Sequence, residues 1–218
     1  MKIATWNLER PTKNSKRLTS ILELLKTTDA DILILTETNG CIQLENYHVF
    51  HSDELSDGDY KAGEKRVSIH SIYPIIKQIN TGRNDTSICV VLQTPTGELA
   101  VYGTVIGIHG NRRKSFTEDL DLQLNDIHKI GKLYPLCIAG DFNISFSDNY
   151  YFTKNGRDKL NETFKQIHQT NLTAEIPQNI DHIVLSNSFL GSRQTHHTQV
   201  WNIDKKLSDH IGVAVTIG

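Results

Sequence analysis

Five short segments of the chain carry carboxylate, amide or imidazole groups at the ends of apolar runs. In chain order they are Trp6-Asn7-Leu8-Glu9, Thr36-Glu37-Thr38, Gly140-Asp141-Phe142-Asn143, Ile180-Asp181-His182 and Ser208-Asp209-His210. If the runs are strands that end at one sheet edge, their carboxylates share a small volume and repel one another, so that a cation is needed. All-oxygen ligands select a hard cation. The segments therefore predict a Mg²⁺ or Mn²⁺ site of the kind that cleaves phosphate esters.

The side chains in these segments suit different tasks. Glu37 is the first candidate metal ligand, because its carboxylate stands at a strand end with no neutralising residue close in sequence. Asp209 has the same character, and the longer side chain of Glu9 can reach a metal directly or through water. Asn7 and Asn143 cannot act as bases, but their amides can donate hydrogen bonds to phosphate oxygens. We therefore expect the two asparagines to hold substrate.

The apolar pattern between the segments predicts the elements that position them. Apolar runs predict strands at residues 3–6, 32–35, 88–92, 99–106, 136–139, 183–185 and 211–217. Apolar residues spaced by three and four predict helices around 18–25, 120–127 and 160–167, and Ser115 with Glu118 offers a capping box for the second helix. Residues 39–66 are predicted to be loops with one weak strand near Val49. Strand-rich halves with helices between them favour two packed sheets flanked by helices.

Length and composition bound the possible classes. A chain of 218 residues with a net charge of −2 predicts one domain over 1–218 and argues against a strongly basic nucleic-acid coat protein. A locally basic rim could still guide a polyanion. Three isolated cysteines without C-x-x-C spacing are typical of a reduced, cytoplasmic protein. No signal peptide is evident, and no apolar stretch approaches the ~20 residues of a membrane span.

The ordered set of motifs resembles the endonuclease/exonuclease/phosphatase superfamily, which includes deoxyribonuclease I and abasic-site endonucleases. The resemblance runs from Asn7 to His210, nearly the whole chain. Each motif alone is a weak signal, whereas Gly-Asp-Phe-Asn after an apolar strand, joined to a C-terminal Ser-Asp-His, is specific. The resemblance implies an α/β (α+β) fold, a four-layer α-β-β-α sandwich of two packed mixed sheets flanked by helices, with the active site at one edge of the sheets.

The resemblance also implies catalytic roles. Asp141 would orient or deprotonate the attacking water, and His210 would be the cation or proton donor at the phosphoryl oxygen. Asp181 would pair with His210, fix its tautomer and raise its pKa. On an extended chain, Asp141 and Asn143 would project to the same side. The predicted reaction is in-line attack of water on phosphorus, with the developing charge spread over Mg²⁺ and His210.

One position departs from the family pattern. Many members carry a histidine at the end of the strand expected at 99–106, where this chain has Val105. His109 follows four residues later, and it either replaces that histidine or is a plain loop residue. Arg112 and Arg113 either grip a phosphate-rich ligand or lie in a solvated loop. The departure leaves the substrate class open.

Three functions therefore stay in view. The first is a nuclease-like phosphodiesterase, and the second is a phosphatase or phosphodiesterase for lipid head groups, inositol phosphates or small molecules. The third is a non-catalytic module that binds a phosphate ligand, although such a module would be expected to lose Glu37, Asp141 or His210, which are all present. The aromatic run at 150–152 either packs a loop onto the core or contacts a base or lipid. The expected partner is a phosphate ester, nucleic acid being one candidate, and the oligomeric state is open.

Overall fold

Two mixed β-sheets form the centre of the molecule in a computed structural model that describes residues 1–54, 60–108, 110–191 and 196–218. Within these residues the first sheet has six strands in the order β11 (His196–Trp201), β12 (Gly212–Ile217), β1 (Lys2–Asn7), β2 (Ile32–Asn39), β4 (Glu64–Ser71) and β3 (His48–His51). The second described sheet has the order β5 (Ile75–Ile79), β6 (Ser87–Thr94), β7 (Gly97–Val105), β8 (Leu136–Asp141), β10 (Asp181–Ser186) and β9 (Gln169–Asn171).

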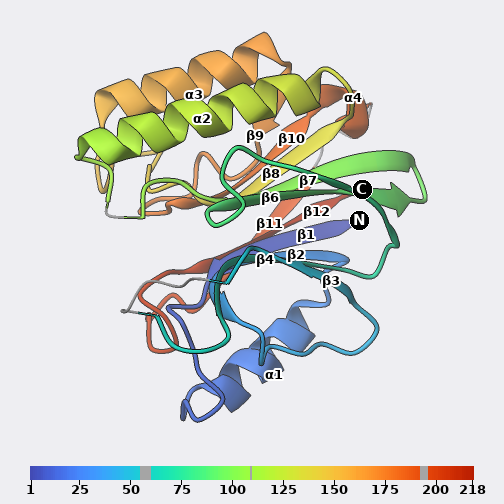
Figure 1. The fold of residues 1–218 in the computed structure, drawn as a ribbon, viewed down its shortest axis with the longest axis vertical. Coiled ribbons are helices and arrows are strands. Elements are labelled where there is room, and N and C mark those ends of the chain that lie inside the picture. The colour runs from blue at the N-terminus through green and yellow to red at the C-terminus, as the bar shows by residue number, and fades with distance from the viewer. Residues whose placement is uncertain (55–59, 109, 192–195) are drawn as a thin grey trace.

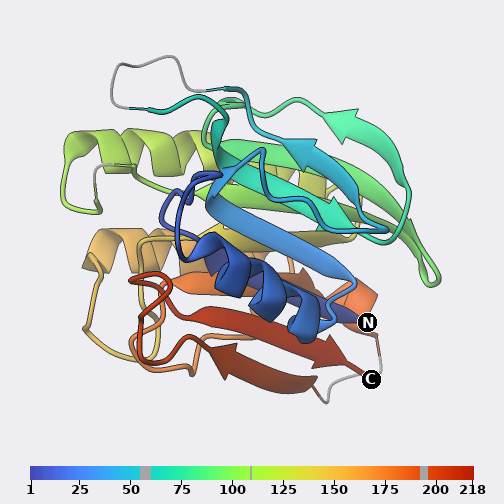
Figure 2. The same ribbon diagram turned by 90° about the horizontal axis from the view of Figure 1, so that it is seen from below.

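Helices cover the outer faces of the two sheets, as Figure 1 shows. They are α1 (Leu18–Thr28) against the first sheet and α2 (Lys114–Gly131) with α3 (Lys154–Gln166) against the second, while the short α4 (Asn187–Leu190) follows β10. The inner faces of the sheets meet in an aliphatic core that includes Ile34, Val67, Val101, Ile183 and Val213. This is the predicted four-layer sandwich, and the turned view in Figure 2 shows α1 lying across the first sheet.

The pairing of the strands brings their functional ends to one edge. β1 and β2 run parallel with Asn7 opposite Thr36, and β7 and β8 run parallel with Val105 opposite Asp141. β10 runs antiparallel to β8, and its first residue, Asp181, pairs with the last residue of β8, Asp141. The start of β10 therefore lies at the same edge as the end of β8.

Three parts of the sequence interpretation need correction. Residues 39–66 were expected to be loops apart from one weak strand near Val49. That strand is β3, but β4 also begins within this range, at Glu64. The strand β11 was missed, since its largely exposed polar residues give no apolar pattern at this edge of the sheet. The capping box is also wrong: α2 begins at Lys114 after Arg113, no side chain caps it, and Ser115 lies inside the helix. In the described part of the chain, none of the helices combines the length and apolar character needed to cross a membrane.

Candidate active site

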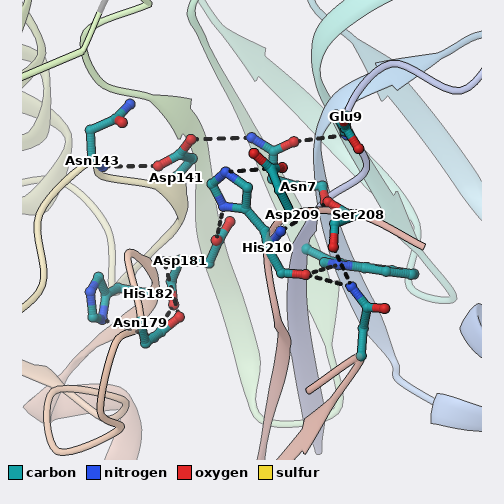
Figure 3. A network of polar contacts seen from close by, with 12 residues as sticks. Asn7, Glu9, Asp141, Asn143, Asn179, Asp181, His182, Ser208, Asp209 and His210 are labelled. Carbon is teal, nitrogen blue, oxygen red and sulfur yellow. Dashed lines mark hydrogen bonds and ion pairs between the residues drawn. The ribbon is translucent and has the colours of Figure 1, made fainter. Parts of the chain in front are cut away.

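The ends of β1 and β8 meet through a side-chain contact between the two sheets. Asn7 and Asp141 are both buried, and Nδ2 of Asn7 donates a hydrogen bond to Oδ2 of Asp141 at 3.2 Å. The other amide atom of Asn7, Oδ1, accepts a hydrogen bond from the backbone N–H of Glu9 at 2.9 Å. Figure 3 shows this chain of contacts from Glu9 through Asn7 to Asp141 and Asn143. Asn7 therefore orients the Asp141 carboxylate and the loop that follows β1.

The Asp141 carboxylate is in a setting that favours its protonated form. Burial raises its pKa most, the charge of His210 opposes this, and the charges of Asp181 and Glu37 raise it again, to about 7. The backbone N–H of Asn143 donates to Oδ1 of Asp141 at 2.9 Å and partly offsets the rise. A carboxylate whose pKa lies near neutrality can accept a proton and release it again at physiological pH.

Asp181 and His210 form the contact that the sequence analysis expected. Nδ1 of His210 lies 2.6 Å from Oδ2 of Asp181, and the Asp181 side chain is buried. Burial alone would lower the pKa of His210, but the charge and hydrogen bond of Asp181, with the charges of Asp141 and Asp209, raise it to about 10. The imidazole is therefore charged at neutral pH, and its Nε2 atom lies 3.8 Å from Oδ1 of the exposed Asp209.

The segment that carries His210 is fastened to the end of β1. Ser208 Oγ donates to the carbonyl oxygen of Asn7 at 2.7 Å and accepts the backbone N–H of His210 at 3.2 Å. The carbonyl oxygen of His210 accepts hydrogen bonds from Trp6 Nε1 at 3.1 Å and Asn202 Nδ2 at 2.7 Å. The first and last motifs of the chain are thus one unit, built on the fully buried Trp6.

The two glutamates have positive φ angles, Glu37 within β2 and Glu9 just after β1, and both contact arginines. Glu37 has a φ of 41° and its Oε2 lies 3.4 Å from Nε of Arg10, while Glu9 has a φ of 52° and its Oε2 lies 2.8 Å from Nη1 of Arg17. Arg17 also donates to the carbonyl oxygens of Glu9 and Leu207. Glu37 shares a cleft with Asp141 and His210, whereas the half-exposed Glu9 carboxylate is held by Arg17. The metal-binding roles of Glu37, Glu9 and Asp209 stay predictions.

Two clefts meet at Asn143 and His210. The first has a volume of about 380 Å³ and is lined on its far side by Glu37, Arg10, Tyr60 and Arg66. The second has a volume of about 280 Å³ and is lined by Tyr150, Tyr151, Gln178, Ile180, Lys205, Asp209 and Ile211 together with Asp181. A ligand centred on His210 can therefore extend in two directions.

The backbone at Asn143 is not extended, contrary to the expectation from the sequence. Its φ is 52°, so the chain turns after β8 and the side chain does not project beside Asp141 as it would on a strand. Nδ2 of Asn143 donates to the carbonyl oxygen of Ile106 at 2.9 Å, and Nδ2 of Asn111 donates to the carbonyl oxygen of Asn143 at 2.8 Å. Asn143 thereby ties its turn to the loop after β7.

The remaining predicted ligand-binding residues have separate outcomes. His109 lies outside the described residues. Arg112 and Arg113 are exposed at the start of α2, and they are not among the described residues that line the two clefts.

Several residues at the clefts were not singled out from the sequence. Arg10, Tyr60 and Arg66 come from two loops and from β4, and no local pattern connects them. Tyr150 and Tyr151 belong to the aromatic run that was expected either to pack a loop onto the core or to contact a base or lipid. Both line the second cleft, and Tyr150 is 51% exposed. For these two tyrosines, the adjacent aromatic pair shortly after the Asp141 motif was the available sequence signal.

The donor chemistry of the first cleft fits a divalent cation. Within the described residues, no three His, Cys, Asp or Glu side chains converge closely enough to form a ready metal cluster. Mg²⁺ commonly takes only one or two carboxylates and keeps several waters. Glu37 lines this cleft, and the negative charges of Glu37 and Asp181 disfavour ionisation of Asp141. A cation beside Glu37 would relieve that repulsion.

Comparisons with known proteins agree with this architecture. The family model described as "Endonuclease/Exonuclease/phosphatase family" matches residues 4–210. The chain therefore belongs to the endonuclease/exonuclease/phosphatase family. This is a family of phosphoesterases, and its members are typically metal-dependent. No curated protein matches the chain significantly.

Solved structures show the same deoxyribonuclease I-like fold at low sequence identity. An AP endonuclease from Archaeoglobus fulgidus has a TM-score of 0.73 at 16% identity, with 100% of this chain and 99% of that chain covered. The structure of a 3′ phosphatase, NExo from Neisseria bound to product DNA hairpin, also has a TM-score of 0.73 at 16% identity, with 100% of this chain and 99% of that chain covered. The endonuclease domain of TRAS1, a telomere-specific non-LTR retrotransposon, has a TM-score of 0.69 at 18% identity, with 99% and 97% covered.

Proposed function

We propose that this protein is a Mg²⁺- or Mn²⁺-dependent phosphodiesterase of the nuclease type, which hydrolyses a P–O bond by in-line attack of water. The observation that carries the proposal is that His210, held by Asp181, lines the same cleft as Asp141 and Glu37. A general base, a cation and a candidate metal ligand are thereby brought to a single place. These are the groups that phosphoryl transfer to water requires.

The residues divide the work by their chemistry. Asp141, held by Asn7 and the backbone of Asn143, orients the attacking water and takes its proton. His210, fixed by Asp181, donates a hydrogen bond from Nε2 to a phosphoryl oxygen as negative charge develops there. A divalent cation held by Glu37, with Asp209 and Glu9 as further candidates, would supply additional stabilisation of that charge.

The arrangement of the clefts supports a diester substrate. Space continues from His210 toward Arg10 and Tyr60 on one side and toward Tyr150 and Lys205 on the other. A phosphodiester carries a substituent on each side of phosphorus, whereas a terminal phosphate has only one. The solved structures of similar fold include endonucleases and a protein bound to a DNA hairpin, which supports nucleic acid as the substrate class.

Hydrolysis of bis(p-nitrophenyl) phosphate tests the reaction directly. We expect p-nitrophenol release with Mg²⁺ or Mn²⁺, loss of release in excess EDTA, and recovery when the metal is restored. Glu37→Gln should need a higher metal concentration for half-maximal rate, while Glu98→Gln, at the exposed start of β7, should not. A panel of plasmid DNA, abasic oligonucleotide, phospholipid and inositol phosphates then assigns the substrate. Turnover of only the phospholipid or the inositol phosphates would rule out the nuclease assignment. A protein that binds these phosphates but hydrolyses none of them would rule out the proposed catalytic function.

A further inference from the structure

Two arginines stack on one tyrosine at the Glu37 end of the first cleft. The guanidinium carbon of Arg10 lies 5.7 Å from the centroid of the Tyr60 ring, and that of Arg66 lies 5.3 Å from the same centroid. All three residues line the cleft that Asp141 and His210 share, and Lys65 lines it as well. The aromatic ring therefore organises positive charge beside the site where a phosphate would react.

Arg66 holds the tyrosine in place. Its side chain is only 7% exposed; Nη2 donates to the hydroxyl oxygen of Tyr60 at 2.9 Å, and Nη1 lies 3.2 Å from Oδ2 of Asp85. Asp85 also pairs with Arg83 at 2.7 Å. Both Nη atoms of the buried Arg66 are therefore already engaged, one by Tyr60 and the other by Asp85. Arg66 is accordingly a positioning residue for Tyr60.

Arg10 is placed differently. Its side chain is 46% exposed, and its one ion pair among the described residues joins Nε to Glu37 Oε2 at a long 3.4 Å. Its backbone is fixed, because the N–H of Arg10 donates to the carbonyl oxygen of Glu37 at 2.7 Å. An arginine has five N–H donors in a planar fork. Among the residues that the structure describes, no other hydrogen bond or ion pair engages the Arg10 guanidinium, which therefore presents donors to the cleft while it lies against the Tyr60 ring.

We propose that Arg10, supported by Tyr60 and Arg66, binds a second phosphate of the substrate, next to the one that is cleaved. This subsite would select substrates with two phosphates about one nucleoside apart, such as an oligonucleotide, over an isolated diester. A planar guanidinium stacked on an aromatic ring is well suited to two parallel hydrogen bonds with phosphate oxygens. A cation on Glu37 would compete for the carboxylate that now pairs weakly with Arg10. The inference rests on the proposed function for the position of the cleaved phosphate.

Binding of small nucleotides in EDTA tests the subsite without any turnover. Titration calorimetry would compare thymidine 3′,5′-bisphosphate with thymidine 3′-monophosphate and 5′-monophosphate. The wild-type protein should bind the bisphosphate about ten-fold more tightly than either monophosphate, as expected for one added charge-assisted contact. Arg10→Met and Tyr60→Leu should reduce this ratio to less than about three-fold, and Arg10→Lys should give an intermediate ratio because it keeps charge but loses the planar fork.

Lys132→Met is the matched control, because it also removes one positive charge. Lys132 is exposed at the end of α2, near the start of β8, whereas Asp141 lies at the other end of β8. This variant should keep the wild-type ratio, and circular dichroism should show that every variant is folded. A wild-type ratio near one, or an unchanged ratio in folded Arg10→Met, would overturn the subsite even if bis(p-nitrophenyl) phosphate is hydrolysed. If that diester is not hydrolysed but the ratio falls in Arg10→Met, the subsite stands and the proposed hydrolase function fails.

Discussion

Nδ1 of His210 lies 2.6 Å from Oδ2 of Asp181, although the two residues belong to different sheets. Asp181 begins β10 in the second sheet, and His210 lies two residues before the start of β12 in the first. The contact therefore exists only when the sheets pack face to face. Figure 3 shows the imidazole in contact with Asp181 on one side and Asp209 on the other, with the Asp141 carboxylate nearby. The site is a property of the assembled sandwich and not of either sheet.

Asp181→Asn should reduce the turnover number for bis(p-nitrophenyl) phosphate by roughly 10²–10⁴-fold. The amide keeps the shape of the side chain but removes the charge that holds His210 protonated and the acceptor that fixes its tautomer. The measurement is the steady-state rate at saturating Mg²⁺, with circular dichroism as a check on folding. Asp204→Asn, a change at an exposed carboxylate, should leave the rate within two-fold. Near-normal activity of Asp181→Asn would remove the proposed role of the pair.

Ser208→Ala should lower both stability and activity. Its buried hydroxyl group joins the carbonyl oxygen of Asn7 to the backbone N–H of His210, and alanine leaves both groups without this partner. We expect the free energy of unfolding to fall by about 1–3 kcal/mol in urea titrations. The rate should fall by about ten-fold or more, since a small displacement of a catalytic group is costly. Ser20→Ala, on the exposed face of α1, is the control, and equal behaviour of the two variants would contradict the prediction.

Gly140→Ala should destabilise the protein by roughly 3 kcal/mol or more. Gly140 has a φ of 136°, and a Cβ atom there would overlap the backbone carbonyl group of Thr104 on β7. Neither the backbone conformation of Gly140 nor the space around it suits a side chain, and Gly140 directly precedes Asp141. Gly40→Ala is the comparison, because a Cβ atom at Gly40 would lie 3.8 Å from its nearest neighbour, the carbonyl oxygen of Gly63. Urea unfolding of the two variants should differ clearly, and similar stabilities would show that β7 and β8 can adjust.

Acid should destabilise the protein partly through His70, a residue remote from the proposed catalytic groups. Burial, followed by the charge of His51, lowers the pKa of His70 from 6.5 to about 3. The unfolded state therefore binds the proton first as the pH falls. The stability that neutral His70 contributes is complete above pH 6.5 and is lost progressively between about 6.5 and 3.

This prediction is checked by urea unfolding at pH 7 and pH 5. The free energy of unfolding attributable to His70 should fall by about 2 kcal/mol over that interval. In His70→Asn the loss of stability on acidification should be smaller, whatever the stability of the variant at pH 7. His48→Asn, at an exposed position of β3, should retain the wild-type dependence on pH. The same slope in wild type and His70→Asn would contradict the assignment.

The local sequence was enough to predict much of the framework. Buried strands such as β2 and β8 are continuous apolar runs, and α1, α2 and α3 carry apolar residues at helical spacing. Local patterns failed where the chain has little apolar signal, as in the exposed strand β11, or where backbone conformation depends on distant contacts, as at Asn143. Asn143 adopts its left-handed turn while bonded to Ile106, which is far away in the sequence.

The order and spacing of the acidic motifs determined the family and which residues are candidates for chemistry, because those features are written in short segments. Only the tertiary structure decided which candidates meet. Packing of the two sheets placed His210 on Asp181, and contacts between the loop after β1, residue 60 and β4 gathered Arg10, Tyr60 and Arg66 at one cleft. Burial by residues from the whole chain then set the proton affinities of the site. These properties depend on contacts between segments far apart in sequence, which no local pattern encodes.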